Sequence, residues 1–464
     1  MPIEYGGSMD RTESSTFQSL TQKLGQFDLS GKKFLIPEMN RIGCYLLASV
    51  FQGFGIDASV MPTFQDLKKG KEVTSGKECF PCQVTLSDLF NYLDEEKARL
   101  GRFFDPENYV YFMPEATGPC RFGMYNKFQR IVLDATPEYT NVKVGSLTTE
   151  NSYSLEGMVD PSQTRQFRKN AYLSVIVGDI LDRLLWRIRP YEGERGAADA
   201  WMQEAVEGMC RFFADTATEI PLQRLITRLE TIGETGRGLM DSQMERKPRV
   251  GVVGEIYLRS HTHSNQDLVR RLERCGAEVV VASITEWMDF TAYDHVRRAR
   301  NALALELRTG HFREALAQLK KQITYRLTLR YQENRQKELY AAANRAMDLE
   351  RPHRVGDLEA YFSKNDIYTF EVGTEASLSI AGLLAYVNDG YDGVVNVYPF
   401  TCMPGTITAS VAKPLMSRFD MPCLDVAYDE TIQPGRSATI ETFMYQVKKR
   451  HDHKLSAHHP APVL

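Results

Sequence analysis

The chain has 464 residues, of which 43% are hydrophobic and 25% are charged, and its formal net charge is −4. This composition is ordinary for a globular protein with two or three cores, and so small a charge gives no reason to expect nucleic acid or a membrane surface as a partner. The start "MPIEYGGSMDRTESS" lacks the apolar segment of a signal peptide, and the most apolar stretch, "AYLSVIVGDILDRLLW", contains charged residues. The sequence therefore predicts a cytoplasmic protein without a membrane span.

After a start expected to be flexible (1–28), short apolar runs alternate with helical patterns over residues 29–150. Buried strands are predicted at "KKFLIPEM", "IDASVM", "NYVYFMP" and "VKVGSL". The segment "NRIGCYLLASVFQGFG" is a helix pattern that ends at a glycine. This alternation is typical of a parallel α/β unit.

Residues 151–246 show helical periodicity without strand signals, which predicts a helical connector. A second α/β unit is expected over 247–450, beginning with "RVGVVGEIY" and containing a charged helical insertion at about 291–350. The insertion suits a solvated helical pair, an arm, a lid or a dimer surface. The histidine-containing tail, 451–464, is expected to be disordered. The predicted fold is α/β, with two Rossmann-like parallel-sheet domains, a helical connector and a long helical insertion.

Several of the eight cysteines fall where parallel strands are expected to end. Ligands of open α/β sheets bind at the carboxyl ends of the strands. The cysteines at such positions are Cys79 and Cys82 in "GKECFPC", before a helix expected from about Thr85, Cys120 in "EATGPCRFG", Cys402 in "PFTCMPG", and Cys44 early in a helix. The other three have predicted structural roles: Cys210 and Cys275 lie within helix patterns, and Cys423 lies at the start of a strand.

Three chemistries compete for these cysteines. Iron–sulfur ligation accounts for the proline and glycine around "CFPC", "GPCRFG" and "CMPG", because glycine lets backbone N–H groups approach cluster sulfurs. A structural zinc usually takes two close C-x-x-C pairs, and only one is present. A redox dithiol would use Cys79 and Cys82 and leave Cys120 and Cys402 unexplained, and unrelated buried thiols are the remaining alternative.

Other motifs are weaker. Gly251 and Gly254 in "GVVGE" lack the third glycine of a dinucleotide fingerprint, so a tight turn is predicted. No G-x-x-x-x-G-K-[ST] phosphate loop occurs. His261 and His263 in "RSHTHSN" could bind a metal, but a polar loop is the favoured interpretation.

The motifs "GKECFPC", "FMPEATGPCRFGMYNKF", "VGVVGEIYLRSHTHSN", "DGYDGVVNVYPFTCMPGT" and "MPCLDVAYDE" resemble the iron–sulfur proteins of the 2-hydroxyacyl-CoA dehydratase superfamily, in its activase-related (CoA-activase-like) branch. The resemblance covers most of residues 30–450. It implies a cysteine-bound four-iron four-sulfur or double-cubane cluster where the two domains meet. The implied ligands are Cys79, Cys120 and Cys402, then Cys82, with Cys44 as a further ligand for a larger cluster.

The resemblance also implies function. Such proteins receive low-potential electrons from a separate ATP-hydrolysing activator, and some are reductases or dehydratase-like lyases. A CoA thioester or a small molecule is the expected substrate, and Arg121, Lys127 and Arg259 are candidates for CoA phosphates. No catalytic residue is predicted, and a homodimer is one possible assembly. The alternative is a non-enzymatic scaffold or cluster-maturation protein with a structural metal.

Overall fold

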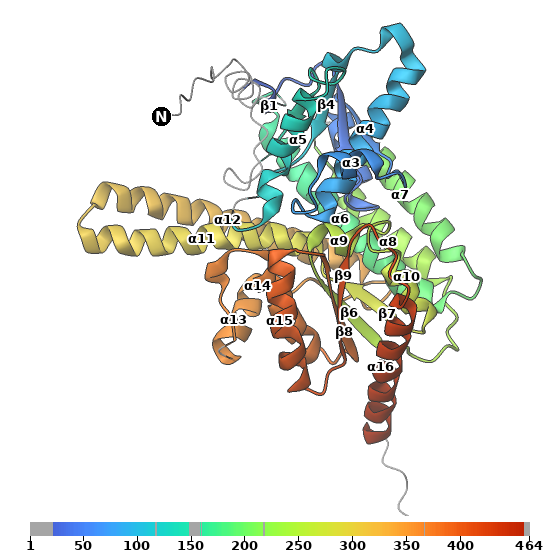
Figure 1. Cartoon of the computed structure of the whole chain (residues 1–464). Coiled ribbons are helices and arrows are strands. Elements are labelled where there is room, and N and C mark those ends of the chain that lie inside the picture. Colours follow the sequence, from blue (N-terminus) through green and yellow to red (C-terminus); the bar gives the residue numbers. More distant parts are fainter. Residues whose placement is uncertain are drawn as a thin grey trace, which may run out of the picture.

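The computed structural model describes residues 22–116, 118–147, 158, 160–216, 219–365 and 367–458. It contains two parallel sheets, each flanked by helices, which lie one above the other in Figure 1. The predicted α/β class with two Rossmann-like units is therefore confirmed.

The first sheet has the strand order β1-β5-β4-β2-β3. Its strands are β1 (Leu24–Gly25), β2 (Lys33–Pro37), β3 (Asp57–Met61), β4 (Tyr109–Phe112) and β5 (Lys143–Gly145). All four residues of β4 are buried, as expected for a central parallel strand with helices on both faces. Four strands match predicted apolar runs. The two-residue β1 was not predicted, because it joins β5 through backbone hydrogen bonds and has no apolar pattern of its own.

Helices connect these strands: α2 (Gly43–Gly53), α3 (Lys68–Val73), α4 (Phe80–Leu100) and α5 (Tyr125–Asp134). The helix α4 begins at Phe80, not near Thr85 as predicted. Pro81 occupies its first turn, where the missing N–H of proline costs no hydrogen bond. Cys79 is therefore the residue that caps the helix, and Cys82 lies inside its first turn.

The second sheet has the order β7-β6-β8-β9. Its strands are β6 (Arg249–Gly254), β7 (Glu278–Val281), β8 (Gly393–Pro399) and β9 (Cys423–Tyr428). Its helices are α9 (Ile256–Ser260), α10 (Leu268–Arg274), α13 (Val355–Asn365), α14 (Glu375–Asn388), α15 (Met403–Ser417) and α16 (Arg436–His458). Short 3₁₀ helices are η1 (Gly101–Phe103), η2 (Pro106–Asn108), η3 (Arg121–Met124), η4 (Arg189–Tyr191) and η5 (Phe370–Val372).

The tail requires a correction, because α16 continues to His458. Its last turns are fixed to the sheet by Asp392, which accepts from Lys454 Nζ at 2.7 Å and lies 3.0 Å from His451 Nδ1. Residues 451–458 are thus helical, while the remaining part of the expected disordered tail, 459–464, lies outside the described residues, as do residues 1–21 of the expected flexible start.

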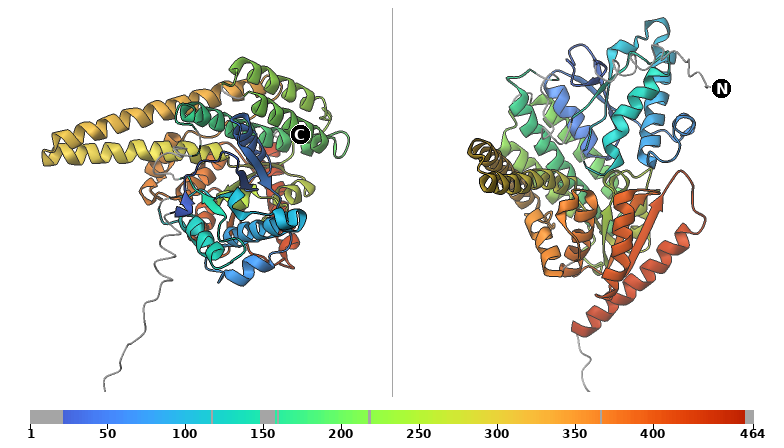
Figure 2. Two further views of the ribbon diagram at one scale, coloured as in Figure 1. Left: turned by 90° about the horizontal axis from the view of Figure 1, so that it is seen from above. Right: turned by 60° about the vertical axis from the view of Figure 1, so that its left-hand side comes forward.

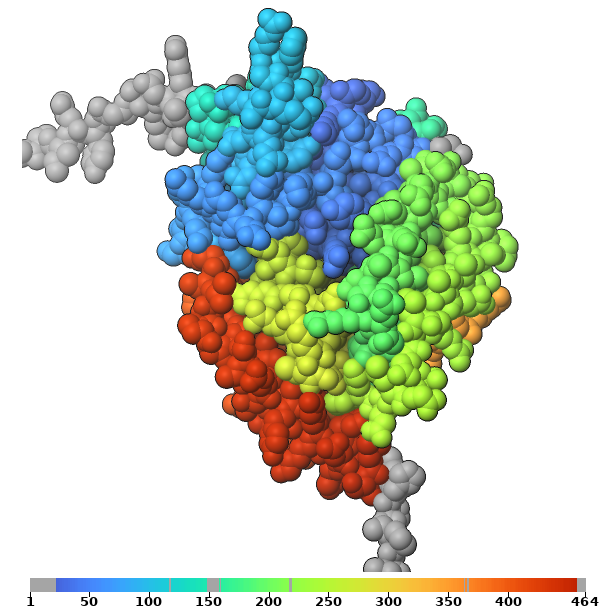
Figure 3. Space-filling view, turned by 90° about the vertical axis from the view of Figure 1, so that its right-hand side faces the viewer, coloured from blue at the N-terminus to red at the C-terminus, as the bar shows by residue number. Residues whose placement is uncertain are grey.

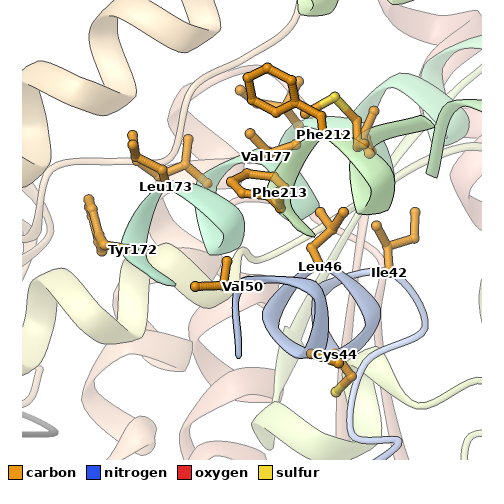
Figure 4. Packing of buried hydrophobic residues seen from close by; sticks show 14 of the residues in the cluster. Ile42, Cys44, Leu46, Val50, Tyr172, Leu173, Val177, Phe212 and Phe213 are labelled. Carbon is orange, nitrogen blue, oxygen red and sulfur yellow. The ribbon is translucent and has the colours of Figure 1, made fainter. Parts of the chain in front are cut away.

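Along the chain, three helices follow β5 and precede β6: α6 (Thr164–Ile188), α7 (Ala197–Asp215) and α8 (Leu222–Arg237). Leu46 of α2 packs with Val177 of α6 and Phe213 of α7 in one hydrophobic cluster (Figure 4). On the other side, Arg189 pairs with Glu273 of α10 at 2.8 Å. These helices lie beside both units (Figure 3).

The helical insertion is an antiparallel pair, α11 (Ile284–Thr309) and α12 (Phe312–Ala343). The two helices extend sideways from the body as an arm (Figures 1 and 2). Asp179 of α6 holds its root, because this carboxylate accepts the N–H groups of Ile284 at 3.0 Å and Thr285 at 2.8 Å.

Candidate functional site

The carboxyl ends of the two sheets face a common cavity. In the first sheet β2 and β4 are neighbours. From β2 the chain continues to β3 on one side, and from β4 it continues to β5 on the other side. In the second sheet β6 and β8 are neighbours, and the chain likewise continues from β6 to β7 on one side and from β8 to β9 on the other. Ligands of such sheets bind where the strand order reverses. The turns after β2, β4, β6 and β8 all contribute to the wall of the cavity.

Cys44 lies in the first turn of α2, shortly after β2. Its side chain belongs to the edge of the hydrophobic cluster that α2 shares with α6 and α7, and it lies on the side of α2 opposite Leu46 (Figure 4). Its sulfur accepts the backbone N–H groups of Met39 at 3.3 Å and Asn40 at 3.4 Å. The thiol is therefore held against the cavity by the end of β2.

The loop of Cys79 follows α3 and not a strand end as predicted, because α3 lies between it and β3. Cys79 lies at the start of α4 with φ of +79°. A non-glycine residue in this region is strained, and such strain is concentrated at functional sites. Cys79 lines the cavity. Cys82 does not: its side chain is fully buried in the core of the first unit, together with Leu86 and Tyr111.

Cys120 follows β4 and also lines the cavity. Gly118, with φ of +100°, allows its turn to approach the second unit, and a Cβ there would lie 3.2 Å from the carbonyl oxygen of Gly373. The Cys120 sulfur lies 3.8 Å from Oε1 of Glu375.

Cys402 follows β8 and caps the N-terminus of α15. Its sulfur accepts the N–H of Gly405 at 3.4 Å, and the residue before it, Thr401, has φ of +69°. A partial positive charge at a helix N-terminus favours a thiolate there.

Four thiols, those of Cys44, Cys79, Cys120 and Cys402, therefore line one cavity of about 260 Å³. The rest of the wall is mainly apolar and includes Leu47, Met113, Phe122, Val175, Ile256 and Met403. The three remaining cysteines lie elsewhere: Cys210 in α7, Cys275 at the end of α10 and Cys423 at the start of β9.

A single metal ion does not suit this arrangement. Tetrahedral zinc with sulfur ligands at 2.3 Å needs sulfurs within about 4 Å of one another. Among the described residues, no three His, Cys, Asp or Glu side chains are grouped closely enough to hold one ion. A polynuclear cluster is larger, and each thiolate binds a different iron of it, so spaced thiols around a cavity fit such a group better.

Two carboxyl groups that the sequence reasoning missed also reach the cavity. Glu255 follows β6, and its oxygens accept the N–H groups of Tyr257 at 3.0 Å and Leu258 at 2.9 Å. Burial, and then the nearby Glu375, raises the pKa of Glu255 to about 7. Burial likewise raises the pKa of Glu375. The position of Glu255 directly after "GVVG" was an available signal, whereas Glu375 begins a helix and follows no strand.

Burial also raises the pKa of the thiols, that of Cys44 to about 11. For Cys79 the Arg121 guanidinium acts in the opposite direction. A metal-bound thiol is deprotonated. Metal cations bound in the cavity would therefore stabilise the thiolate form, which burial alone disfavours.

No family model matches this chain, and no curated protein matches it. No described helix is long and apolar enough to cross a membrane.

The three cations considered for CoA phosphates already have protein partners. Arg121 donates to the carbonyl oxygens of Lys77 and Thr401, and so joins the Cys79 and Cys402 turns. Lys127 pairs with Glu115 at 2.6 Å. Arg259 is buried and donates to carbonyl oxygens, including that of Ser283 at 2.9 Å.

The histidine pair is structural in character. His261 is buried, with its ring nitrogens 2.8 Å from Thr63 Oγ1 and 2.8 Å from Ser264 Oγ. The ring centroids of His261 and His263 are 6.2 Å apart. Gly254 has φ of +121° and forms the predicted tight strand-to-helix turn, whereas Gly251, predicted to share that turn, lies within β6.

Proposed function

We propose that this chain is an iron–sulfur redox protein of the 2-hydroxyacyl-CoA dehydratase/activase-related type, with its cluster between the two α/β units. The observation that carries the proposal is the convergence of four thiols, contributed by both α/β units, on one mainly apolar cavity. Buried thiols are often inert core residues, but four around a shared cavity at two sheet edges are not explained by packing.

The geometry favours Cys44, Cys79, Cys120 and Cys402 as ligands. The family resemblance ranks Cys82 ahead of Cys44, but both are buried in hydrophobic clusters and only Cys44 lines the cavity. Four thiolates suffice for one four-iron cluster. The proposed ligand set therefore differs at one position from the set implied by sequence.

A cluster at this site would exchange single electrons. The residues around it would tune that exchange: backbone N–H groups at Met39, Asn40 and Gly405 donate to two of the sulfurs, and apolar side chains exclude water. Glu255, with its pKa near 7, would hold a proton beside the cavity. Because the sequence has no phosphate loop, ATP-dependent supply of electrons is assigned to a separate activator protein.

The wall of the cavity favours a small uncharged substrate. Two carboxyl groups face it, and Arg121, Lys127 and Arg259 are engaged with other protein groups. CoA phosphates would need free cations. A CoA thioester, the other substrate class implied by the resemblance, is less well supported.

The test is iron and sulfide content per chain after anaerobic purification, combined with an EPR spectrum after reduction with dithionite. We expect a brown protein with about four or more irons, which bleaches on reduction. A colourless protein with stoichiometric zinc would contradict the proposal and favour the scaffold with a structural metal.

A further inference from the structure

The arm formed by α11 and α12 presents a row of large apolar side chains to solvent. On α12 this row consists of Phe312, Leu316, Leu319, Ile323 and Leu327, spaced by four, three, four and four residues. Such spacing places all five on one side of a helix, over a length of about 22 Å. Phe312, Leu316 and Leu327 are 73%, 67% and 64% exposed, respectively.

This outer row does not hold the arm together. The buried positions of the outer arm are small or polar: Ala299 on α11, and Ala315 and Gln322 on α12. A hairpin stabilised only by its own packing would place large apolar residues between its helices and polar residues outside. The arm shows the reverse, so its apolar row is available to another molecule.

The arm is also strongly basic. Residues 298–330 contain eight Lys and Arg side chains and two Glu side chains, a net charge of +6 in a chain whose total is −4. On α12, Arg313 and Lys320 lie along one edge of the apolar row and Arg326 along the other, by helical position. None of these three forms an ion pair within the described part of the chain, whereas Arg298 pairs with Asp294 near the root of the arm.

We propose that this outer face of α12 is a docking surface for an acidic amphipathic helix of another protein. An apolar row at coiled-coil spacing fits the apolar face of a second helix. Its basic edges attract Glu and Asp beside that face and repel a second copy of the same arm. A nucleic-acid backbone would meet the cations but would leave the apolar row uncovered.

The arm that carries this surface begins at the wall of the cavity. Ile284 and Trp287, at the start of α11, line the cavity, and α11 runs from there for 26 residues to the tip of the arm. A partner on the arm would therefore lie on an extension of the cavity wall. The docking inference itself does not depend on the presence of a cluster.

The experiment uses the full-length protein and two fluorescent synthetic helical peptides with the same leucine heptads. One peptide has Glu at the positions beside the leucines and the other has Lys. By fluorescence anisotropy we expect the Glu peptide to bind about tenfold or more tightly than the Lys peptide, with an affinity that falls as salt rises. The double variant Leu316→Glu/Ile323→Glu should abolish this binding, while Leu455→Glu, at a 54% exposed position on α16, should not affect it.

A charge-reversed variant, Arg313→Glu/Lys320→Glu, keeps the apolar row and should reverse the preference toward the Lys peptide. Circular dichroism would verify that each variant keeps the helical content of the parent. Equal binding of the two peptides, or unchanged binding by Leu316→Glu/Ile323→Glu, would overturn the proposal. So would a dimer in sedimentation velocity that this same variant converts to a monomer, because the row would then join two copies of this chain.

Discussion

Three of the four thiols at the cavity are positioned by a distinct local feature of the backbone. Cys79 itself has a positive φ, Cys402 caps a helix after a residue with positive φ, and Cys44 accepts two backbone N–H groups. Hydrogen bonds to sulfur favour the thiolate, whereas burial favours the neutral thiol. These opposing effects would be reconciled if the thiols bind a cationic metal.

Replacing the cavity thiols one at a time should separate ligands from neighbours. We predict that Cys44→Ser and Cys402→Ser each lose most of the iron of the anaerobically purified protein, because a four-iron cluster would then lack one thiolate. Cys82→Ser should keep its iron, since Cys82 does not line the cavity. Cys210→Ser serves as the control. Loss of iron in Cys82→Ser with full iron in Cys44→Ser would contradict our ligand set.

Glu255 should make the metal-free protein less stable as the pH rises. Its pKa is raised from 4.5 to about 7 in the folded state, so its stabilising contribution is complete below about pH 4.5 and is lost as the pH rises through 7. The change amounts to about 3 kcal/mol. The variant Glu255→Gln keeps an acceptor for the two N–H groups but does not titrate. Urea unfolding at pH 5 and pH 8 should therefore show a smaller loss for the variant, and parallel pH profiles would refute this expectation.

At the scale of elements, close approach of backbones forms the turns that carry the site. A Cβ on Gly254 would lie 1.9 Å from the carbonyl oxygen of Val397, so only glycine fits where β6 ends beside β8. This turn leads directly to Glu255, and β8 leads to Cys402. Arg121 then connects the Cys402 turn to that of Cys79.

The variant Gly254→Ala should therefore separate β6 from β8 and destabilise the protein by about 3 kcal/mol or more, through both strain and overlap with backbone atoms. Gly390→Ala is a matched control, because Gly390 also has a positive φ, +75°, but has open space around its Cβ position. Its cost should be only about 1 to 2 kcal/mol, from backbone strain. Unfolding in urea measures both, and equal losses would show that contact with Val397 is unimportant.

At the scale of the molecule, two sheets contribute to one site. Cys44, Cys79 and Cys120 come from the first unit and Cys402 from the second. The helices α6 and α7 pack on the first unit, and Arg187 and Arg189 pair with Glu278 and Glu273 of the second. The units would thus keep their relative position without a cluster, and a cluster would tie together the turns at the cavity.

Removal of iron should loosen those turns as a group. We predict that anaerobic chelation increases hydrogen exchange around Cys79, Cys120 and Cys402 together, because a bound group that favours the closed arrangement stabilises it by mass action. The strands β2 and β6 should stay protected, since they are buried in separate cores. A response confined to the Cys79 turn would mean that Cys402 does not share the cluster.

The sequence by itself determined the α/β class, four strands of the first sheet, and the positions of Cys120 and Cys402 just after strands. Short apolar runs and glycine turns are local patterns, and parallel strands bring their carboxyl ends to one edge whatever the details of packing. The same local reasoning misjudged the start of α4 and the end of α16, where Pro81 and Asp392, respectively, decide the boundary.

Only the tertiary structure decided which side chains meet. Cys82 lies three residues from Cys79 and belongs to the same hydrophobic cluster, but only Cys79 also lines the cavity. Glu375 reaches Cys120 from 255 residues away. The outward row on α12 was likewise hidden, since a helical apolar pattern does not state whether a neighbour covers it. Long-range packing determines each of these arrangements, and no local pattern in the sequence predicts them.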